Sequence, residues 1–237
     1  LTRGPLARIR MLRLAADDHV VLFTAHHLVC DGWSFGMLVD ELSRCYNAFR
    51  AGGEPQLPPP LPFGDYARGH AASRDGDEAR AARAFWLERF REPPPPLDLP
   101  TDRPYPASKS YAGGMLRKRF GERSFAALQE AAPGLGGTLF ATLFGLFAGF
   151  LGRFCGNRDL VVGVPAAAQT MVGRDELIGH CLNFLPVRLR LDPRQTIHQL
   201  AESARDAVIE AYEHQDFTYG TLVRELELPR DAARLPL

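Results

Sequence analysis

Residues 26–34 read His-His-Leu-Val-Cys-Asp-Gly-Trp-Ser and combine two adjacent imidazoles with a carboxylate. Histidine has an unperturbed pKa of about 6.5, close to neutral pH, so it can take up or release a proton during a reaction. Adjacent side chains on an extended segment point to opposite faces, so one of His26 and His27 can face a cleft while the other packs in the structure. Asp31 can orient the loop through a buried ion pair or backbone hydrogen bonds, and Gly32 permits a tight turn or the close approach of another backbone.

Two other interpretations of this segment stay open. The histidine pair can be purely structural, or it can bind zinc together with Cys30 and Asp31. Adjacent histidines diverge and no second ligand cluster has suitable spacing, so we expect no metal site. The cysteines lack metal-binding or redox spacing, which predicts reduced thiols lying mostly in the core; they are Cys30, Cys45, Cys155 and Cys181.

A strand and a helix are expected on either side of this segment. Residues 19–25 are mostly apolar and β-favouring, which predicts a buried strand. Ser34 is predicted to cap a helix that runs to about Arg50. The strand would hold the imidazoles rigidly, and the helix start would supply free backbone donors. The predicted helix carries one apolar stripe, formed by Phe35, Leu38, Leu42, Cys45 and Phe49.

The rest of the chain alternates between predicted strands and helices, which indicates an α/β layered architecture. The apolar segment 138–154 is shorter than the ~20 residues of a membrane span and ends near Arg153, so we expect a buried core helix there. Further strands are predicted at 7–14, 113–120, 159–166 and 183–191, helices at 63–91, 122–132, 197–214 and 218–228, and proline-rich connections at 51–62 and 91–110.

Composition narrows the function classes. The 237 residues carry 28 Lys+Arg and 28 Asp+Glu, so the net charge is zero and the basic field required for nonspecific nucleic-acid binding is missing. Hydrophobic residues make up 46% of the chain, as in an ordinary globular protein of one large or two small domains. No signal-peptide pattern follows Leu1. We therefore expect a cytoplasmic protein with neither a nucleic-acid nor a membrane partner, cut from a longer polypeptide.

The segment HHLVCDGWS resembles the HHxxxDG signature of nonribosomal peptide synthetase condensation domains, whose fold is related to chloramphenicol acetyltransferase. Four further segments resemble family motifs and follow in the family's order: PTDRP (100–104), GHCLNFLPVR (179–188), HQDFTYG (214–220) and RDAARLPL (230–237). Two of these segments depart from the family's pattern: Thr218-Tyr219-Gly220 replaces the usual Pro-Phe-Glu, and Ala233 stands where the family usually has Ser.

The resemblance implies an α/β, chloramphenicol acetyltransferase-like layered sandwich. Residues 1–110 would form the end of the N-terminal lobe, with the histidine motif and the proline-rich crossover, and residues 111–237 a truncated C-terminal lobe. The family's active site lies in a tunnel between the lobes. Its two earliest motifs are absent here, so we expect a fragment that could be inactive alone. In the family the aspartate of the motif pairs with an arginine from the missing half, so Asp31 could be unpaired.

The implied activity is amide-bond formation between a carrier-bound acyl or peptidyl thioester and a carrier-bound aminoacyl thioester. His27, the second histidine of the motif, is the expected catalytic residue. No tightly bound cofactor is expected, because the substrates travel on phosphopantetheine arms. The expected partners are upstream and downstream peptidyl or acyl carrier proteins and adjacent adenylation or other megasynthase domains. The expected supporting residues are His26, Asp31, Gly32, Ser34 and Asn183.

Several relatives remain as alternatives. Epimerisation domains share the histidine motif but continue in a DGVSW-like pattern, whereas this chain reads Asp-Gly-Trp-Ser-Phe at residues 31–35. Heterocyclisation domains replace the histidines with aspartates. An ester-forming relative stays possible. The alternative of a different class is a non-catalytic module that recruits carrier proteins or tailoring enzymes. Such modules usually have a degraded histidine motif, so the intact motif favours an enzyme.

Overall fold

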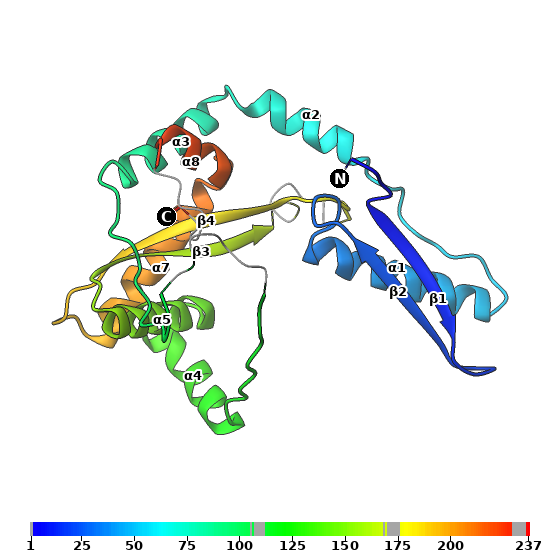
Figure 1. The fold of residues 1–237 in the computed structure, drawn as a ribbon, viewed down its shortest axis with the longest axis horizontal. Helices are drawn as coiled ribbons and strands as arrows, with labels where there is room; N and C mark the ends of the chain where they lie inside the picture. Colours follow the sequence, from blue (N-terminus) through cyan, green and yellow to red (C-terminus); the bar gives the residue numbers. More distant parts are fainter. Residues whose placement is uncertain (1, 105, 107–111, 168, 170–175, 229–235) are drawn as a thin grey trace. The chain divides into compact units, whose positions relative to one another are not determined.

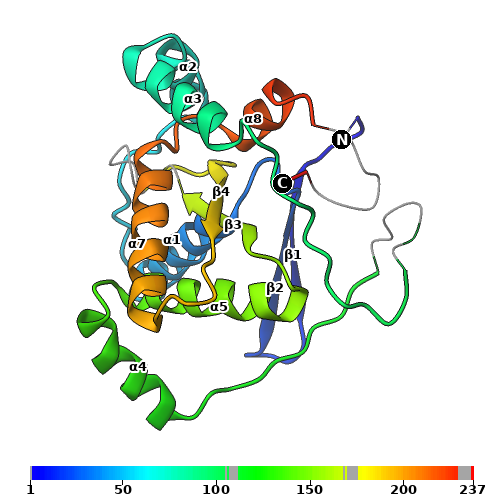
Figure 2. The same cartoon turned by 90° about the vertical axis from the view of Figure 1, so that its left-hand side faces the viewer.

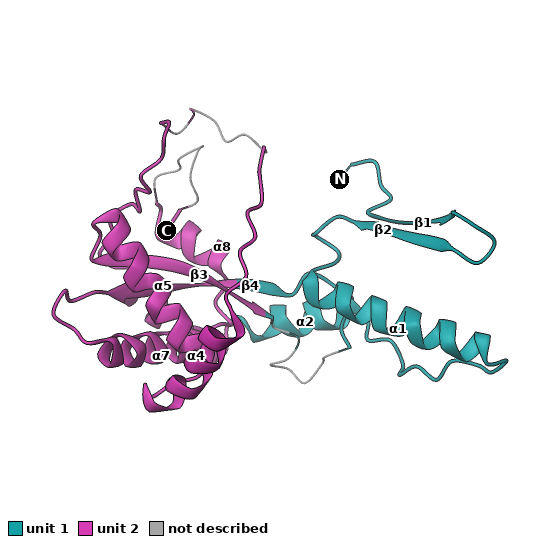
Figure 3. Ribbon diagram, turned by 90° about the horizontal axis from the view of Figure 1, so that it is seen from below, with its two compact units in different colours: residues 1–74, 167–183 teal, residues 75–166, 184–237 magenta. Residues whose placement is uncertain are grey.

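The structure, a computed structural model, describes residues 2–104, 106, 112–167, 169, 176–228 and 236–237. It divides into two compact units (Figure 3). Unit 1 comprises Leu1–Arg74 and Ala167–Asn183, and unit 2 comprises Asp75–Ala166 and Phe184–Leu237. Most of the RDAARLPL segment lies outside the described residues.

Unit 1 begins with an antiparallel hairpin, drawn in blue in Figure 1. Its strands are β1 (Ala7–Arg13) and β2 (His19–Ala25), which confirms both predicted strands. The expected burial of β2 is wrong, because no residue of the hairpin is fully buried. In the described part of the chain β1 is the only strand that pairs with β2, so the side chains on this ribbon remain accessible.

Unit 1 continues with the helices α1 (Gly32–Arg50) and α2 (Phe63–Ser73). The prediction that Ser34 caps α1 is wrong: Asp31 is the N-cap, and its carboxylate accepts a hydrogen bond from the Ser34 backbone N–H. The two assignments differ because aspartate and serine are both good caps, and periodicity alone does not place the first helical residue. The apolar stripe of α1 is largely exposed. The one fully buried residue of this helix is Ser34, which lies outside the stripe.

Unit 2 contains the second strand pair and most of the helices. The strands are β3 (Asp159–Ala167) and β4 (Leu182–Arg190); β4 starts in unit 1 and continues into unit 2. Figure 2 shows α5 and α7 beside this strand pair. The helices are α3 (Asp77–Arg89), α4 (Glu122–Gly134), α5 (Leu139–Cys155), α7 (Ile197–Glu213) and α8 (Tyr219–Glu225).

An apolar core joins these elements. It draws on Trp86 and Phe90 at the end of α3, on inward-facing residues of both strands, and on one face each of α5 and α7. Helices α5 and α7 approach closely at Gly145, where a Cβ atom would lie 3.0 Å from the Ala204 Cβ. The predicted core helix is thus buried on one face, while its other face exposes Phe140, Phe147, Phe150 and Phe154.

Two further expectations are corrected. Residues 113–120, a predicted strand, lie in irregular structure with Met115, Leu116 and Phe120 exposed. A strand needs a partner for its backbone groups, and a short β-favouring pattern does not supply one. Of the four cysteines, all free, only Cys181 is buried.

No single described helix is long and apolar enough to span a membrane. Helices α4 and α5 pass that test only as a pair, by length and composition, and they are bent by 101°.

Candidate functional site

The histidine motif lies in unit 1, in the turn between β2 and α1. His26 continues the hairpin through its N–H, which donates to the Leu6 carbonyl (2.8 Å). Its ring also takes part in the turn, because Nδ1 accepts from the Leu28 N–H (3.1 Å). His26 therefore shapes the local backbone, while the exposed His27 ring engages a distant part of the chain. Both side chains are exposed, and the division of roles between His26 and His27 stays a prediction.

Asp31 is buried, with 3% of its surface exposed, and both carboxylate oxygens are engaged. Oδ1 accepts from the Ser34 N–H (2.8 Å) and hydroxyl (2.7 Å). Oδ2 accepts from Gln169 Nε2 and the Cys181 N–H, each at 3.0 Å. Among the described residues no cation pairs with this carboxylate. Neutral donors from the start of α1 and from residues 169 and 181 satisfy it instead.

Ser34 extends this network. Its single hydroxyl proton can go to Asp31 Oδ1 or to the Gly179 carbonyl (2.8 Å). Its oxygen accepts from the Gly179 N–H (3.0 Å). The side chain is fully buried. Gly179 and Cys181 are thereby both tied to the start of α1, with His180 between them.

The network changes the proton affinity of its members. Burial alone would raise the pKa of Asp31, but the donors from Ser34, Cys181 and Gln169 stabilise the carboxylate and hold that pKa below the ordinary value. The pKa of the Cys181 thiol is raised to about 11, because burial and, to a lesser degree, the Asp31 charge outweigh the lowering effect of a hydrogen bond with Tyr66. Cys181 is therefore a protonated structural thiol at neutral pH.

A second histidine meets the motif in space. His27 Nδ1 and His180 Nδ1 lie 3.2 Å apart, and the rings meet edge to face with their centroids 5.2 Å apart. Sequence reasoning passed over His180, although it stands second in the quoted GHCLNFLPVR segment. Gln169 was missed as well, and nothing in the sequence pattern marks it.

Two predicted site residues remain, Gly32 next to Asp31 and Asn183 close to His180 in the sequence. Gly32 is the first residue of α1 and is exposed, and no described acceptor binds its N–H. Asn183 is half-buried on β4, three residues after His180. Within the described residues no group of three His, Cys, Asp or Glu side chains could hold a metal ion.

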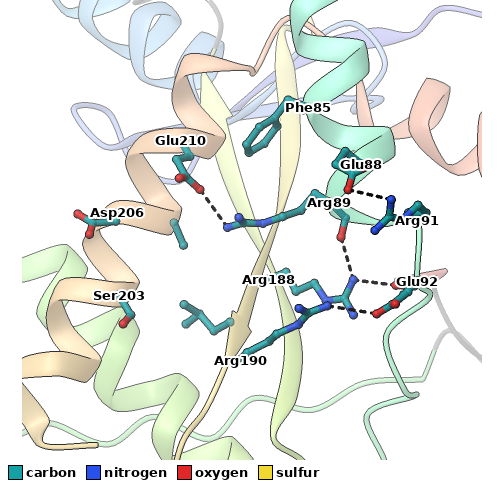
Figure 4. A pocket seen from close by; sticks show the side chains of 12 residues that line it. Phe85, Glu88, Arg89, Arg91, Glu92, Arg188, Arg190, Ser203, Asp206 and Glu210 are labelled. Atoms are coloured by element: carbon teal, nitrogen blue, oxygen red, sulfur yellow. Dashed lines mark hydrogen bonds and ion pairs between the residues drawn. The ribbon is translucent and has the colours of Figure 1, made fainter.

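Unit 2 holds a separate charged cavity of about 580 Å³ (Figure 4). Arg188 is one of the residues that line it, and this side chain binds Asp159 through two contacts of 2.8 and 2.6 Å and also donates to the carbonyls of Arg89 and Glu92. Hydrogen bonding to Asp159 raises the pKa of Arg188 despite burial. Its four acceptors tie β4 to β3 and to the end of α3, which indicates a structural role.

The HQD segment also lies in unit 2 and packs against α3. The His214 ring stacks on Phe85 with centroids 3.9 Å apart, and its carbonyl accepts from Trp86 Nε1 (2.8 Å). Gln215 Nε2 donates to the Tyr212 carbonyl (2.8 Å). These contacts close the end of α7 onto the core.

The chain matches the family model of the condensation domain over residues 1–237. It is 39% identical over 238 residues to a linear gramicidin synthase of Brevibacillus parabrevis, and the match covers 100% of this chain and 3% of that protein. It is 36% identical to phosphinothricin tripeptide synthetase PhsC of Streptomyces viridochromogenes, covering 100% of this chain and 22% of that protein. The chain belongs to the condensation-domain family, and it spans only a small part of these relatives.

Solved structures agree with this assignment. The X-domain from teicoplanin biosynthesis superposes with a TM-score of 0.86 at 27% identity, covering 99% of this chain and 53% of that one. The first condensation domain of the CDA synthetase gives a TM-score of 0.75 at 25% identity, covering 93% and 49%. The predicted family and the predicted α/β, chloramphenicol acetyltransferase-like fold class are confirmed.

Proposed function

We propose that the polypeptide carrying this chain joins an acyl or peptidyl thioester to the amine of an aminoacyl thioester, with both substrates delivered on phosphopantetheine arms of carrier proteins. The observation that carries this proposal is the exposed His27, held between a strand and a helix of a condensation-domain fold. Adjacent adenylation or other megasynthase domains would supply the loaded carriers. The division into lobes at residues 1–110 and 111–237 stays a prediction.

His27 is the residue we assign to proton transfer. A free α-amino group has a pKa of about 7.7–8.0, so an appreciable fraction is already neutral near pH 7. The nitrogen becomes acidic as the C–N bond forms, and His27 can accept that proton. Help of this kind is typically worth about 10²–10⁴-fold in rate. Positioning of the two tethered substrates adds to it.

The other predicted site residues would support this step. The Gly32 N–H, at the exposed start of α1, could donate to the oxygen of the tetrahedral intermediate. Asp31, Ser34 and His26 would hold the turn in place through the hydrogen bonds described above. Asn183 remains a predicted site residue on β4.

The first prediction concerns His27→Ala in the full polypeptide. Amide formation from two loaded carriers should fall roughly 10²–10⁴-fold because the proton acceptor is gone. Product formation is measured by quenched-flow chromatography of the carrier-bound product. His19→Ala, at the other end of β2, is the matched control and should keep the parent rate. Condensation at the parent rate in His27→Ala would show that the assignment of His27 is wrong.

A second candidate is a module that binds another protein. A solved complex joins the X-domain and OxyB from teicoplanin biosynthesis, and that X-domain superposes on 100% of this chain with a TM-score of 0.86. The same assay separates the two functions. A burst of amide product supports the enzyme, whereas its absence with correctly loaded carriers supports the binding module.

A further inference from the structure

The His27 and His180 rings form a pair whose proton arrangement is constrained. Their Nδ1 atoms lie 3.2 Å apart, a hydrogen-bond distance, and a hydrogen bond there holds a single proton. One ring must donate and the other must accept. If His27 accepted, its neutral ring would carry its proton on Nε2 and could not take another there. If His27 donates, its Nε2 lone pair is free.

We propose that His180 is a positioning residue that accepts the Nδ1 proton of His27 and so leaves His27 Nε2 open as the proton acceptor. This inference rests on the proposed function, since it describes how the same histidine is prepared for its task. His180 would then be neutral, with its own proton on Nε2. It touches His27 and is assigned no contact with a substrate.

The backbone on both sides of His180 is anchored to the start of α1. Gly179 binds the Ser34 hydroxyl through both its N–H and its carbonyl. The Cys181 N–H donates to the buried Asp31 carboxylate. The two residues that flank His180 are thus held by two side chains of the His-His motif segment, Ser34 and Asp31. In the proposal, these flanking bonds hold the His180 backbone so that its ring meets the His27 ring.

In the proposed step, one proton moves from the amine to the departing sulfur by way of His27 Nε2. The amine nitrogen attacks the thioester carbonyl carbon and forms the C–N bond, while its proton passes to His27 Nε2. The C–S bond breaks, and the departing sulfur receives that proton from Nε2 to become a thiol. In between, His27 is an imidazolium whose Nδ1–H still donates to His180 Nδ1. A hydrogen bond to a charged group is stronger than one between neutral groups, so His180 stabilises this intermediate form.

The experiment compares His180→Ala with His180→Asn in the full polypeptide. The Asn amide oxygen can accept where Nδ1 accepted, while Ala offers nothing. We expect His180→Ala to lower kcat about tenfold, in keeping with one lost hydrogen bond to an exposed charged ring. KM should not change. His180→Asn should recover most of that loss. Long-range ¹H–¹⁵N NMR of histidine-labelled protein reads the tautomer of His27 independently of turnover.

The NMR signals should show His27 protonated at Nδ1 in the parent and in His180→Asn, and a shift toward the Nε2–H form in His180→Ala. An unchanged tautomer together with an unchanged kcat in His180→Ala would overturn the role of His180. Failure of the proposed function is a different result, namely a fully active His27→Ala variant. A drop in kcat that His180→Asn does not recover, with an unchanged tautomer, would also overturn the positioning role.

Discussion

Units 1 and 2 are held together by different kinds of interaction. Unit 2 buries aliphatic and aromatic side chains from two strands and from α3, α5, α7 and α8. The fully buried side chains described in unit 1 are few, and the polar ones among them are Asp31, Ser34 and Gln169. The candidate site therefore lies in the unit organised around one buried carboxylate. Such a network places side chains precisely in space but depends on every partner being present.

Two helices of similar length show the same contrast. Helix α5 has 17 residues and buries six of them against its neighbours, whereas α1 has 19 residues and buries only Ser34. Both carry an apolar stripe of helical period. The stripe predicts which face a helix would bury, and the number of partners in its own unit decides whether that face is covered.

The chain's two tryptophans fall one in each unit, Trp33 in unit 1 and Trp86 in unit 2. A Trp33→Phe background leaves Trp86 to report unfolding of unit 2, and a Trp86→Phe background leaves Trp33 to report unit 1. Urea titrations of the two backgrounds thus measure the two units separately. Each of the following predictions uses one of these reporters.

The largest effect on stability is expected for Phe90→Ala in the Trp33→Phe background. Phe90 is 1% exposed and stacks near Trp86, with ring centroids 6.2 Å apart. Removing a buried ring should lower the free energy of unfolding by roughly 3–5 kcal/mol. Phe154→Ala on the exposed face of α5 is the matched control and should cost less than about 1 kcal/mol. Equal losses in the two variants would contradict an apolar core in unit 2.

Unit 1 should respond most strongly to Asp31→Ala, measured in the Trp86→Phe background. The change leaves the Ser34 and Cys181 N–H groups and the Gln169 amide without their acceptor, which should cost about 2–4 kcal/mol. Asp40→Ala on the same helix is the control, because Asp40 is exposed and lies 3.8 Å from Arg44 in a surface ion pair. It should change stability by less than about 1 kcal/mol. If the Trp33 unfolding curve of Asp31→Ala matched that of the parent, the conclusion that the Asp31 carboxylate stabilises unit 1 would be wrong.

Acid should lower the free energy of unfolding of unit 1 by protonating the Asp31 carboxylate. The folded pKa of Asp31 lies below its ordinary value of 3.8, so the unfolded chain binds the proton more readily. Its contribution is therefore complete above the unfolded value and is lost as the pH falls through the lower folded value. Trp33 unfolding, followed from about pH 6 to pH 3, should show a loss of stability that is smaller in Asp31→Asn. Identical pH profiles would mean that Asp31 contributes nothing to acid sensitivity.

Much of this fold follows from local patterns. The strands β1 and β2, the helix α5 and the helix α7 all lie where sequence patterns put them. The turn that carries His27 was equally visible, because a distinctive motif stands between a strand and a helix. These features depend on neighbouring residues, which a sequence shows directly.

What could not be predicted depends on partners far along the chain. His180 lies 153 residues from His27, and Cys181 lies 150 residues from Asp31. No periodicity connects such positions. The strand prediction for residues 113–120 is wrong for a related reason, since the pattern favours a strand but does not show whether a partner strand is present. The prediction of the α1 cap is wrong because Asp31 and Ser34 both suit that position, and only the geometry shows that Asp31 accepts the hydrogen bond.

The smallest effect is expected for Leu42→Gln in the Trp86→Phe background. Periodicity places Leu42 in the apolar stripe of α1, yet 54% of the side chain is exposed. Since little apolar surface is removed from water there, the free energy of unfolding should change by less than about 0.5 kcal/mol. If the stripe instead formed a core of unit 1, the same change would cost roughly 1.5 kcal/mol or more. A loss of that size in the Trp33 signal would show that unit 1, like unit 2, is stabilised by apolar burial, and the contrast between the units would not hold.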